Sequence, residues 1–179
     1  MRNYDLSPEL NEGLLLRTQW LGRPVMGMVE FLWGLSDGIN DAGLSVALAY
    51  GGRSETGVGF GITTIVRYVL ETCNTVDDAL AVLDRVPSHM AYNLVLADAS
   101  GRTASVEMAP GGGMTKMPLA VATNHQGGAP AADRPTFTRT FELRSHLEKL
   151  QIKPRKLNRQ FLKAPLLQDR YSKGETPNV

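Results

Sequence analysis

The chain has 179 residues, of which 42% are hydrophobic and 21% are charged, a composition typical of a soluble, globular, single-domain protein. This excludes disorder along the whole chain, and no apolar run reaches the ~20 residues that cross a bilayer. The net charge of +1 hides an asymmetry: residues 1–133 hold 8 Lys or Arg against 14 Asp or Glu, whereas residues 134–179 hold 11 against 4.

The basic C-terminal part allows two interpretations. It could contact nucleic acid or an acidic partner, or it could be a solvated basic face that docks onto the acidic body. It lacks the interleaved aromatic residues on which bases stack, so we expect no nucleic-acid partner.

The number of cysteines and the first residues of the chain indicate the cellular compartment in which we expect the protein. Cys73 is the one cysteine, which excludes an internal disulfide framework and a cysteine-based zinc cluster and fits a reducing compartment. Asp5, Glu9 and Glu12 stand where the apolar segment of a signal peptide would be. We therefore expect a cytoplasmic protein without a membrane partner.

The first fifty residues predict short strands separated by Gly or Asp. Apolar and β-branched residues favour strands over 14–16, 25–33 and 44–50, with a turn over 37–41. A helix follows, because apolar residues recur at helical spacing from Ile62 to Cys73. Cys73 completes this stripe, so it is interpreted as a small buried apolar residue rather than a nucleophile.

A second helix is predicted to begin at Thr75, which forms a capping box with Asp78, and to end at Pro87. Beyond it the pattern favours the following elements: a hairpin of strands 92–97 and 103–108 around the turn 98–101, a loop over 110–113, a short strand over 119–123, and a helix over 135–150 whose apolar face comprises Phe137, Phe141, Leu143, Leu147 and Leu150. This order of elements predicts an α+β fold with a mostly antiparallel sheet.

Standard phosphate and metal motifs are absent from the sequence. The glycine-rich run 57–61 could cradle an anion before a helix, but a flexible connection is the favoured interpretation. His89, His125 and His146 are too scattered to suggest a triad or a metal site, and His146 is expected to be an exposed helix residue.

Three polar clusters are candidates for chemistry: residues 2–5, 123–125 and 136–139. Each also has a structural explanation, as a strand end, a turn and a helix cap. Further short motifs stand in register with them along the chain. The set comprises Arg2-Asn3-Tyr4-Asp5, Gly38-Ile39-Asn40-Asp41-Ala42-Gly43-Leu44, Arg67-Tyr68-Val69-Leu70-Glu71 with Thr75-Val76-Asp77-Asp78-Ala79, Tyr92-Asn93 with Ala97-Asp98 and Gly101, Val106-Glu107 with Pro110, and Ala122-Thr123-Asn124-His125.

Together these motifs resemble the cysteine N-terminal-nucleophile (Ntn) hydrolases of the acyl-CoA:6-aminopenicillanate acyltransferase type, with penicillin V acylase and choloylglycine hydrolase as more distant relatives. The resemblance covers roughly residues 1–147 and implies an αββα sandwich of antiparallel sheets between helices. We expect an Ntn-hydrolase-like domain over residues 1–150, incomplete at both ends, followed by a basic segment over residues 151–179 that is partly disordered or begins a missing C-terminal part.

The resemblance also implies a mechanism in which an N-terminal cysteine attacks an acyl carbonyl with its own α-amino group as the base. Asp5 would hold that amine, Arg2 would favour the thiolate, Asn124 would donate to the oxyanion and Arg139 would support the site. Arg2 and Asp5 can serve one site only if the strand ends or bulges between them. No metal or redox cofactor is implied.

The sequence departs from the family pattern at several points. In the family the cysteine lies one strand and a turn upstream of the Arg-Asn-x-Asp segment, whereas here Met1 directly precedes Arg2. The family's last strands would follow Thr176, and Ala49 stands near a position where several relatives carry asparagine. Missing edge strands would leave unpaired strand edges and exposed apolar surface, so we expect association, as a homo-oligomer, or marginal stability.

The sequence therefore predicts an acyltransferase or amide hydrolase acting on a small acyl amide or acyl thioester through a nucleophile that is absent from this chain. The alternative is a non-catalytic remnant that acts as an interaction module. A nucleic-acid binder that uses the basic tail is the third and least favoured interpretation.

Overall fold

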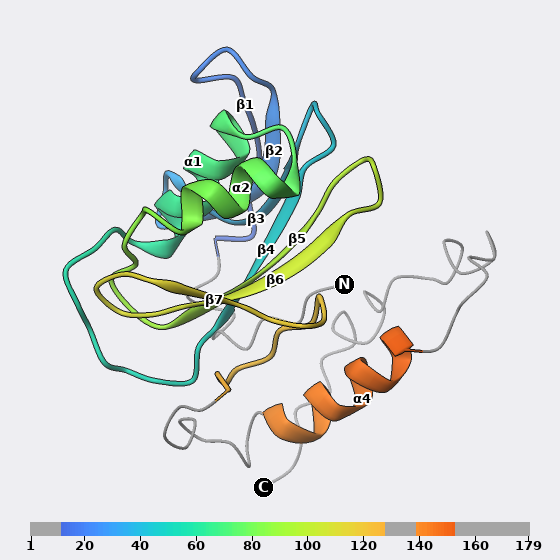
Figure 1. Ribbon diagram of the computed structural model, residues 1–179. Helices are drawn as coiled ribbons and strands as arrows, with labels where there is room; N and C mark the ends of the chain where they lie inside the picture. The colour runs from blue at the N-terminus through green and yellow to red at the C-terminus, as the bar shows by residue number, and fades with distance from the viewer. Residues whose placement is uncertain (1–11, 128–138, 153–179) are drawn as a thin grey trace, which may run out of the picture.

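The structure is a computed structural model that describes residues 12–127 and 139–152. Seven strands form one antiparallel sheet in which each strand pairs with the next along the chain. Among the described residues three helices accompany the sheet, and in Figure 1 α1 and α2 lie on one side of it and α4 on the other. The elements are β1 (Leu15–Thr18), β2 (Val25–Glu30), β3 (Gly34–Asn40), β4 (Ser45–Tyr50), α1 (Ile62–Thr72), α2 (Val76–Leu83), β5 (Tyr92–Ala97), β6 (Thr103–Met108), β7 (Met114–Lys116) and α4 (Thr140–Ile152).

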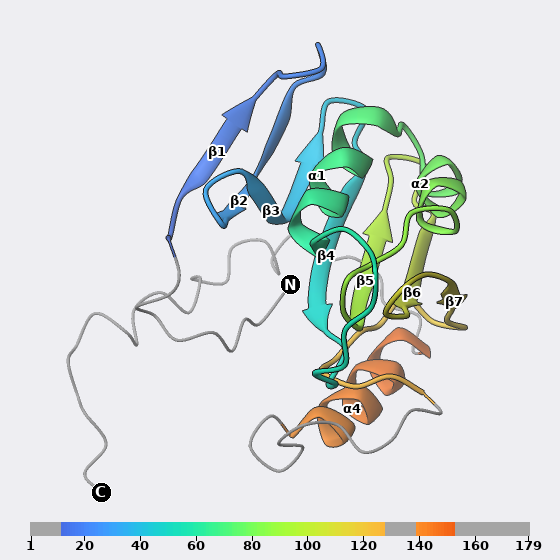
Figure 2. The same ribbon diagram turned by 90° about the vertical axis from the view of Figure 1, so that its left-hand side faces the viewer.

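The predicted α+β class with an antiparallel sheet is confirmed. The described residues contribute one sheet of the sandwich, with α1 seated over β3 and β4 and α2 beside β6 (Figure 2). None of the described helices is long and apolar enough to cross a membrane. The basic segment 151–179 lies almost entirely outside the described residues.

The apolar core lies between the sheet and α1 with α2. The predicted helical stripe is confirmed, because Ile65, Val66 and Val69 are almost fully buried against the sheet. Cys73 follows α1 and is also buried, which raises the pKa of its thiol by desolvation. Its interpretation as a buried apolar residue is therefore confirmed. The sheet contributes Leu35, Leu44, Val46, Leu48, Leu94, Leu96, Val106 and Met108 to this core.

The N-terminus of α2 is capped as predicted. The Thr75 hydroxyl accepts from the Asp78 backbone N–H at 3.2 Å, and the Asp78 carboxylate accepts from the Thr75 N–H at 3.1 Å. These hydrogen bonds, that of the Thr75 side chain foremost, hold the pKa of Asp78 below its usual range. Asp98, in the β5–β6 turn, accepts from the Val76 N–H at 2.9 Å and so joins the hairpin to the start of α2.

Two predictions over residues 25–41 are wrong. The strand predicted over 25–33 ends at Glu30, and the turn predicted over 37–41 is part of β3 apart from its last residue. Glycine in β2 and β3 serves close packing here: a Cβ on Gly27 would lie 2.3 Å from the Asp37 carbonyl oxygen, and one on Gly38 would lie 2.9 Å from Leu70.

The chain instead turns at residues 31–33, which carry none of the usual turn residues. Phe31 and Leu32 have left-handed backbone angles, with φ of 57° and 64°, and their side chains are 70% and 85% exposed. Large apolar residues rarely adopt this conformation, so sequence rules extend the strand through them.

The strand predicted over 119–123 is also wrong, because these residues join no ladder among the described strands, whereas the unpredicted β7 pairs with β6. Of the helix predicted over 135–150, the part from Thr140 onward is confirmed, and residues 135–138 lie outside the described residues. Its expected apolar face is only partly packed, since Phe141 and Leu143 are 50% and 40% exposed. His146 is exposed as expected.

Exposed apolar side chains, which were expected, cluster on the first three strands and their turns. β1 and β7 form the two edges of the described sheet. Several large apolar side chains near β1, β2 and β3 are largely open to solvent: Leu14, Leu15, Trp20, Leu21, Met26, Phe31, Leu32, Trp33 and Ile39. Patches of this kind are typical of association surfaces.

The left-handed backbone at Leu32 gives a prediction about stability. Left-handed backbone costs most residues about 1–2 kcal/mol and asparagine less, so we expect Leu32→Asn to raise the free energy of unfolding by up to about 1 kcal/mol. Urea denaturation measures the change. Val58→Asn is the control, because Val58 is 91% exposed but lacks a positive φ. An equal effect of both substitutions would contradict the explanation.

Candidate functional site

A row of polar side chains crosses the face of β5 and β6 that points away from α1 and α2. Asn93 and Glu107 are cross-strand partners, and Ser105, which pairs with Val95, lies two pairs further along. They alternate with the core residues Leu94 and Val106, and all three are buried. Buried polar groups need hydrogen-bonding partners, and here the irregular segment 117–127 supplies them.

Ser105 holds the first half of this segment. Its hydroxyl lies within hydrogen-bonding distance of the carbonyls of Leu119 (2.7 Å) and Val121 (3.2 Å), and its own carbonyl accepts from the Met117 N–H at 2.9 Å. The segment predicted as a strand is therefore held largely by side chains of the sheet. Its apolar residues are typical of a strand, but it pairs with none of the described strands.

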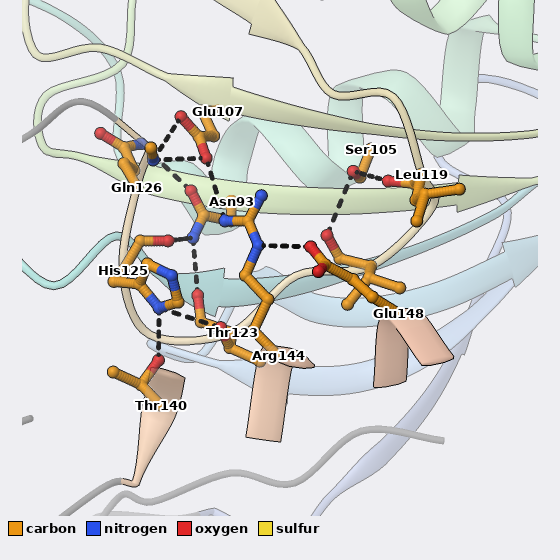
Figure 3. Close-up of polar contacts among 12 residues, drawn as sticks. Asn93, Ser105, Glu107, Leu119, Thr123, His125, Gln126, Thr140, Arg144 and Glu148 are labelled. Carbon is orange, nitrogen blue, oxygen red and sulfur yellow. Dashed lines mark hydrogen bonds and ion pairs between the residues drawn. The ribbon is translucent and has the colours of Figure 1, made fainter. Parts of the chain in front are cut away.

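Asn124 is the central residue of a three-residue turn. The His125 N–H donates to the Thr123 carbonyl at 2.8 Å, closing a γ-turn. The Asn93 side-chain amide donates to the carbonyls of Thr123 (2.7 Å) and His125 (2.9 Å), so both carbonyls are tied to β5 (Figure 3). Thr123 and His125 are buried while Asn124 is partly exposed.

Gln126 links this turn to the rest of the sheet. Its side-chain amide donates to Asn93 Oδ1 at 3.1 Å and to the Met108 carbonyl at 3.0 Å. Its carbonyl oxygen accepts from Arg53 at 2.8 Å, and Arg53 also pairs with Glu55. Gln126 thereby connects β5, β6 and the loop after β4.

Glu107 connects the segment to α4. Both of its carboxylate oxygens accept from the Gly127 N–H, at 2.9 and 3.1 Å, and Arg144 of α4 lies 3.4 Å away. Arg144 also pairs with Glu148 on its own helix at 3.0 Å. The space between Arg144 and the strands is too small to admit a ligand, because side chains fill it almost completely.

His125 makes the second connection to α4. Its Nδ1 lies 2.9 Å from the Thr140 hydroxyl and 3.1 Å from the Thr123 hydroxyl, and its ring packs on Phe141 with centroids 4.3 Å apart. Burial, together with the positive charge of Arg144, lowers the pKa of His125, although Glu107 and Glu148 oppose the shift. The neutral imidazole can therefore accept a hydroxyl hydrogen bond at Nδ1.

The four residues expected to form the site have different outcomes. Arg2 and Asp5 lie outside the described residues. Asn124 lies at the centre of the turn that the Asn93 side chain holds. Arg139 directly precedes α4, has a φ of 48° and is exposed, and it is the next residue, Thr140, that contacts His125.

Sequence reasoning assigned no role to Asn93, Glu107, Gln126 or Arg144. A sequence signal for this cluster did exist. Asn93 and Glu107 are polar residues within two strands that are otherwise mostly apolar, which indicates buried polar groups. Cys73, by contrast, belongs to the core on the opposite face of the sheet. Among residues 12–127 and 139–152, no three His, Cys, Asp or Glu side chains gather in the manner of a metal site.

The comparison with protein families identifies the chain. The profile of the family described as acyl-coenzyme A:6-aminopenicillanic acid acyl-transferase matches residues 1–164, so the chain belongs to this family. No curated protein sequence matches the chain.

Among solved structures, an N-acylethanolamine-hydrolyzing acid amidase ortholog from Caenorhabditis elegans is similar, with a TM-score of 0.58 and 15% identity over 89% of this chain and 75% of that one. This likeness shows the Ntn-hydrolase-type fold.

Two further structures align less well: penicillin V acylase from Agrobacterium tumefaciens (TM-score 0.46, 26% identity, 73% of this chain and 41% of that one) and a single-residue variant of conjugated bile acid hydrolase from Clostridium perfringens (0.44, 17%, 75% and 44%). The chain spans less than half the length of each.

The environment of His125 predicts a pH dependence of stability. An unfolded imidazole has a pKa of about 6.5, and the folded value is lower, so the unfolded chain binds more protons in the interval between them. The free energy of unfolding should therefore fall as the pH drops below about 6.5. Urea denaturation at several pH values between about 7.5 and about 5.5 measures this.

The variants His125→Gln and His146→Gln test the source of this dependence. His125→Gln should flatten the profile over that interval, and His146→Gln, at an exposed position of the same helix that His125 contacts, should leave it unchanged. Equal slopes in all three proteins would contradict the assignment to His125.

Proposed function

We propose that this chain belongs to a cysteine Ntn acyltransferase or amide hydrolase and supplies its acyl-binding and oxyanion groups. The substrate is a small N-acyl compound or an acyl thioester. The observation that carries the proposal is the position of Asn124, a carboxamide at the centre of a turn whose two flanking carbonyls are held from β5 by the buried Asn93 side chain. A donor held in advance of the reaction is what stabilisation of an oxyanion requires.

The proposed reaction proceeds through an acyl-enzyme. The thiol of an N-terminal cysteine, outside the 179 residues, passes its proton to the cysteine's own α-amino group, and its sulfur forms a bond to the acyl carbon. The Asn124 amide donates to the oxyanion that forms. The intermediate collapses as the amine or thiol leaving group departs with that proton, and a second amine or water then takes the acyl group.

Three other residues complete the proposed site. Asp5 holds the α-amino group of the nucleophile, and Arg2 favours the thiolate by its positive charge. Arg139 supports the site from the start of α4, and the contacts of Thr140 and Phe141 with His125 keep that end of the helix beside the turn.

The alternative function is a non-catalytic interaction module. Its support is that Cys73, the one cysteine of the sequence, is buried in the core, and that apolar side chains of the first three strands are exposed. Homo-oligomerisation through this surface suits either function, and sedimentation velocity measures it.

The intact mass of the protein from its native source separates the two functions. A mass above 19.5 kDa, or a co-purifying chain with an N-terminal cysteine, supports the enzyme, and labelling of that cysteine by an acylating β-lactone would trap the acyl-enzyme. A mass of 19.5 kDa without labelling supports the interaction module.

Asn124 is the residue to substitute in the protein so obtained. We expect Asn124→Ala to lower kcat by about 10²–10³ with little change in KM, because it removes one oxyanion donor. The assay follows the release of thiol from acyl-CoA thioesters or of amine from N-acyl compounds. Asn74→Ala, at an exposed asparagine in the connection between α1 and α2, is the control. Unchanged kcat in Asn124→Ala would contradict the proposed role.

A further inference from the structure

We infer that Asn93 is the positioning residue of the oxyanion site: its carboxamide orients Asn124 by holding the two carbonyls that flank it. The catalytic meaning of this inference rests on the proposed function. Its geometric part, that Asn93 controls the conformation of Asn124, rests only on contacts within the described chain.

The hydrogen bonds around Asn124 restrain the peptide groups on both sides of it. The carbonyl of the preceding peptide, that of Thr123, accepts from Asn93, and the N–H of the following peptide, that of His125, donates to the same carbonyl. The His125 carbonyl accepts the second hydrogen bond of Asn93. A side-chain amide has two N–H donors, and both of those of Asn93 are used on this turn.

The orientation of the Asn93 amide is itself determined by its neighbours. Its Oδ1 accepts from the side-chain N–H of Gln126 at 3.1 Å, and the side-chain oxygen of Gln126, Oε1, accepts from Arg53. A flipped Asn93 amide would place two N–H donors against each other and an oxygen against two carbonyls. Since Asn93 is only 2% exposed, water cannot readily compensate for such an error.

Asn40 offers a matched comparison on the other face of the sheet. Its side-chain amide donates to the carbonyls of Leu70 (2.9 Å) and Cys73 (2.8 Å) at the end of α1, and its Oδ1 accepts from the Leu44 N–H. It is 5% exposed. The two asparagines therefore make the same kind of clamp in similar burial, but only Asn93 holds the turn at Asn124.

The test compares Asn93→Asp with Asn40→Asp in the full chain. Each substitution replaces two donors by an oxygen that faces two carbonyls, so both should lower the urea midpoint. Only Asn93→Asp should shift the side-chain amide resonances of Asn124 in ¹⁵N NMR spectra and speed hydrogen exchange of the His125 N–H at least tenfold. Unchanged Asn124 resonances in Asn93→Asp, or equal shifts in Asn40→Asp, would overturn the inference.

Asn93→Thr serves if the aspartate variant does not fold. The hydroxyl keeps one donor, and threonine suits a strand, so the Asn124 resonances should still shift and the His125 N–H should exchange faster than in the unchanged protein. Exchange as slow as in the unchanged protein would count against the clamp.

Turnover separates this inference from the proposed function. In the native-source enzyme, Asn93→Thr should lower kcat more than it raises KM, and Asn40→Asp should leave both near their original values at temperatures where the variants remain folded. Shifted Asn124 resonances together with full activity of Asn124→Ala would refute the proposed function and leave the clamp intact. Unshifted resonances together with inactive Asn124→Ala would refute the clamp alone.

Discussion

The described structure depends on the need to satisfy polar side chains buried on the second face of the sheet. Asn93, Ser105 and Glu107 project from β5 and β6 on the face opposite α1 and α2, and all three are buried. Each would be costly to bury without a partner. The carbonyls and N–H groups of segment 117–127 supply these partners, and the path of that segment follows from them.

The two faces of the sheet are therefore stabilised in different ways. On the first face, α1 and α2 bury apolar side chains, which tolerate small shifts because hydrophobic contact has little directionality. On the second face, hydrogen bonds of defined length and angle determine where each carbonyl lies. A site that must place a donor against a reacting oxygen needs the second kind of support, and Asn124 lies on that face.

Helix α4 is joined to the same network by polar contacts. Arg144 lies against Glu107, and Thr140 and Phe141 contact His125, whereas Phe141 and Leu143 stay largely exposed. The position of α4 therefore depends in part on charge and on the neutral form of one imidazole. This couples the start of the helix, where Arg139 lies, to the turn that carries Asn124.

Much of the fold was determined by local sequence patterns. The stripe from Ile62 to Cys73, the capping box at Thr75 and the hairpin around Asp98 were each predictable, because helical period, caps and turns act within a few residues. Short motifs in register carried the resemblance that predicted the family. The same resemblance selected Asn124 as a candidate site residue. Local rules failed at Phe31 and Leu32, where apolar residues occupy a turn, and at Gly38, whose place is in a strand.

Only the tertiary structure decided what holds the candidate site. Asn93 and Thr123 are 30 positions apart, and Arg53 and Gln126 are 73 apart, so no local pattern relates them. Residues 119–123 have the composition of a strand. Their carbonyls nevertheless accept hydrogen bonds mainly from side chains of β5 and β6. Sequence alone determines which side chains can donate or accept, but long-range packing decides which of them meet, because burial makes each unpaired group costly.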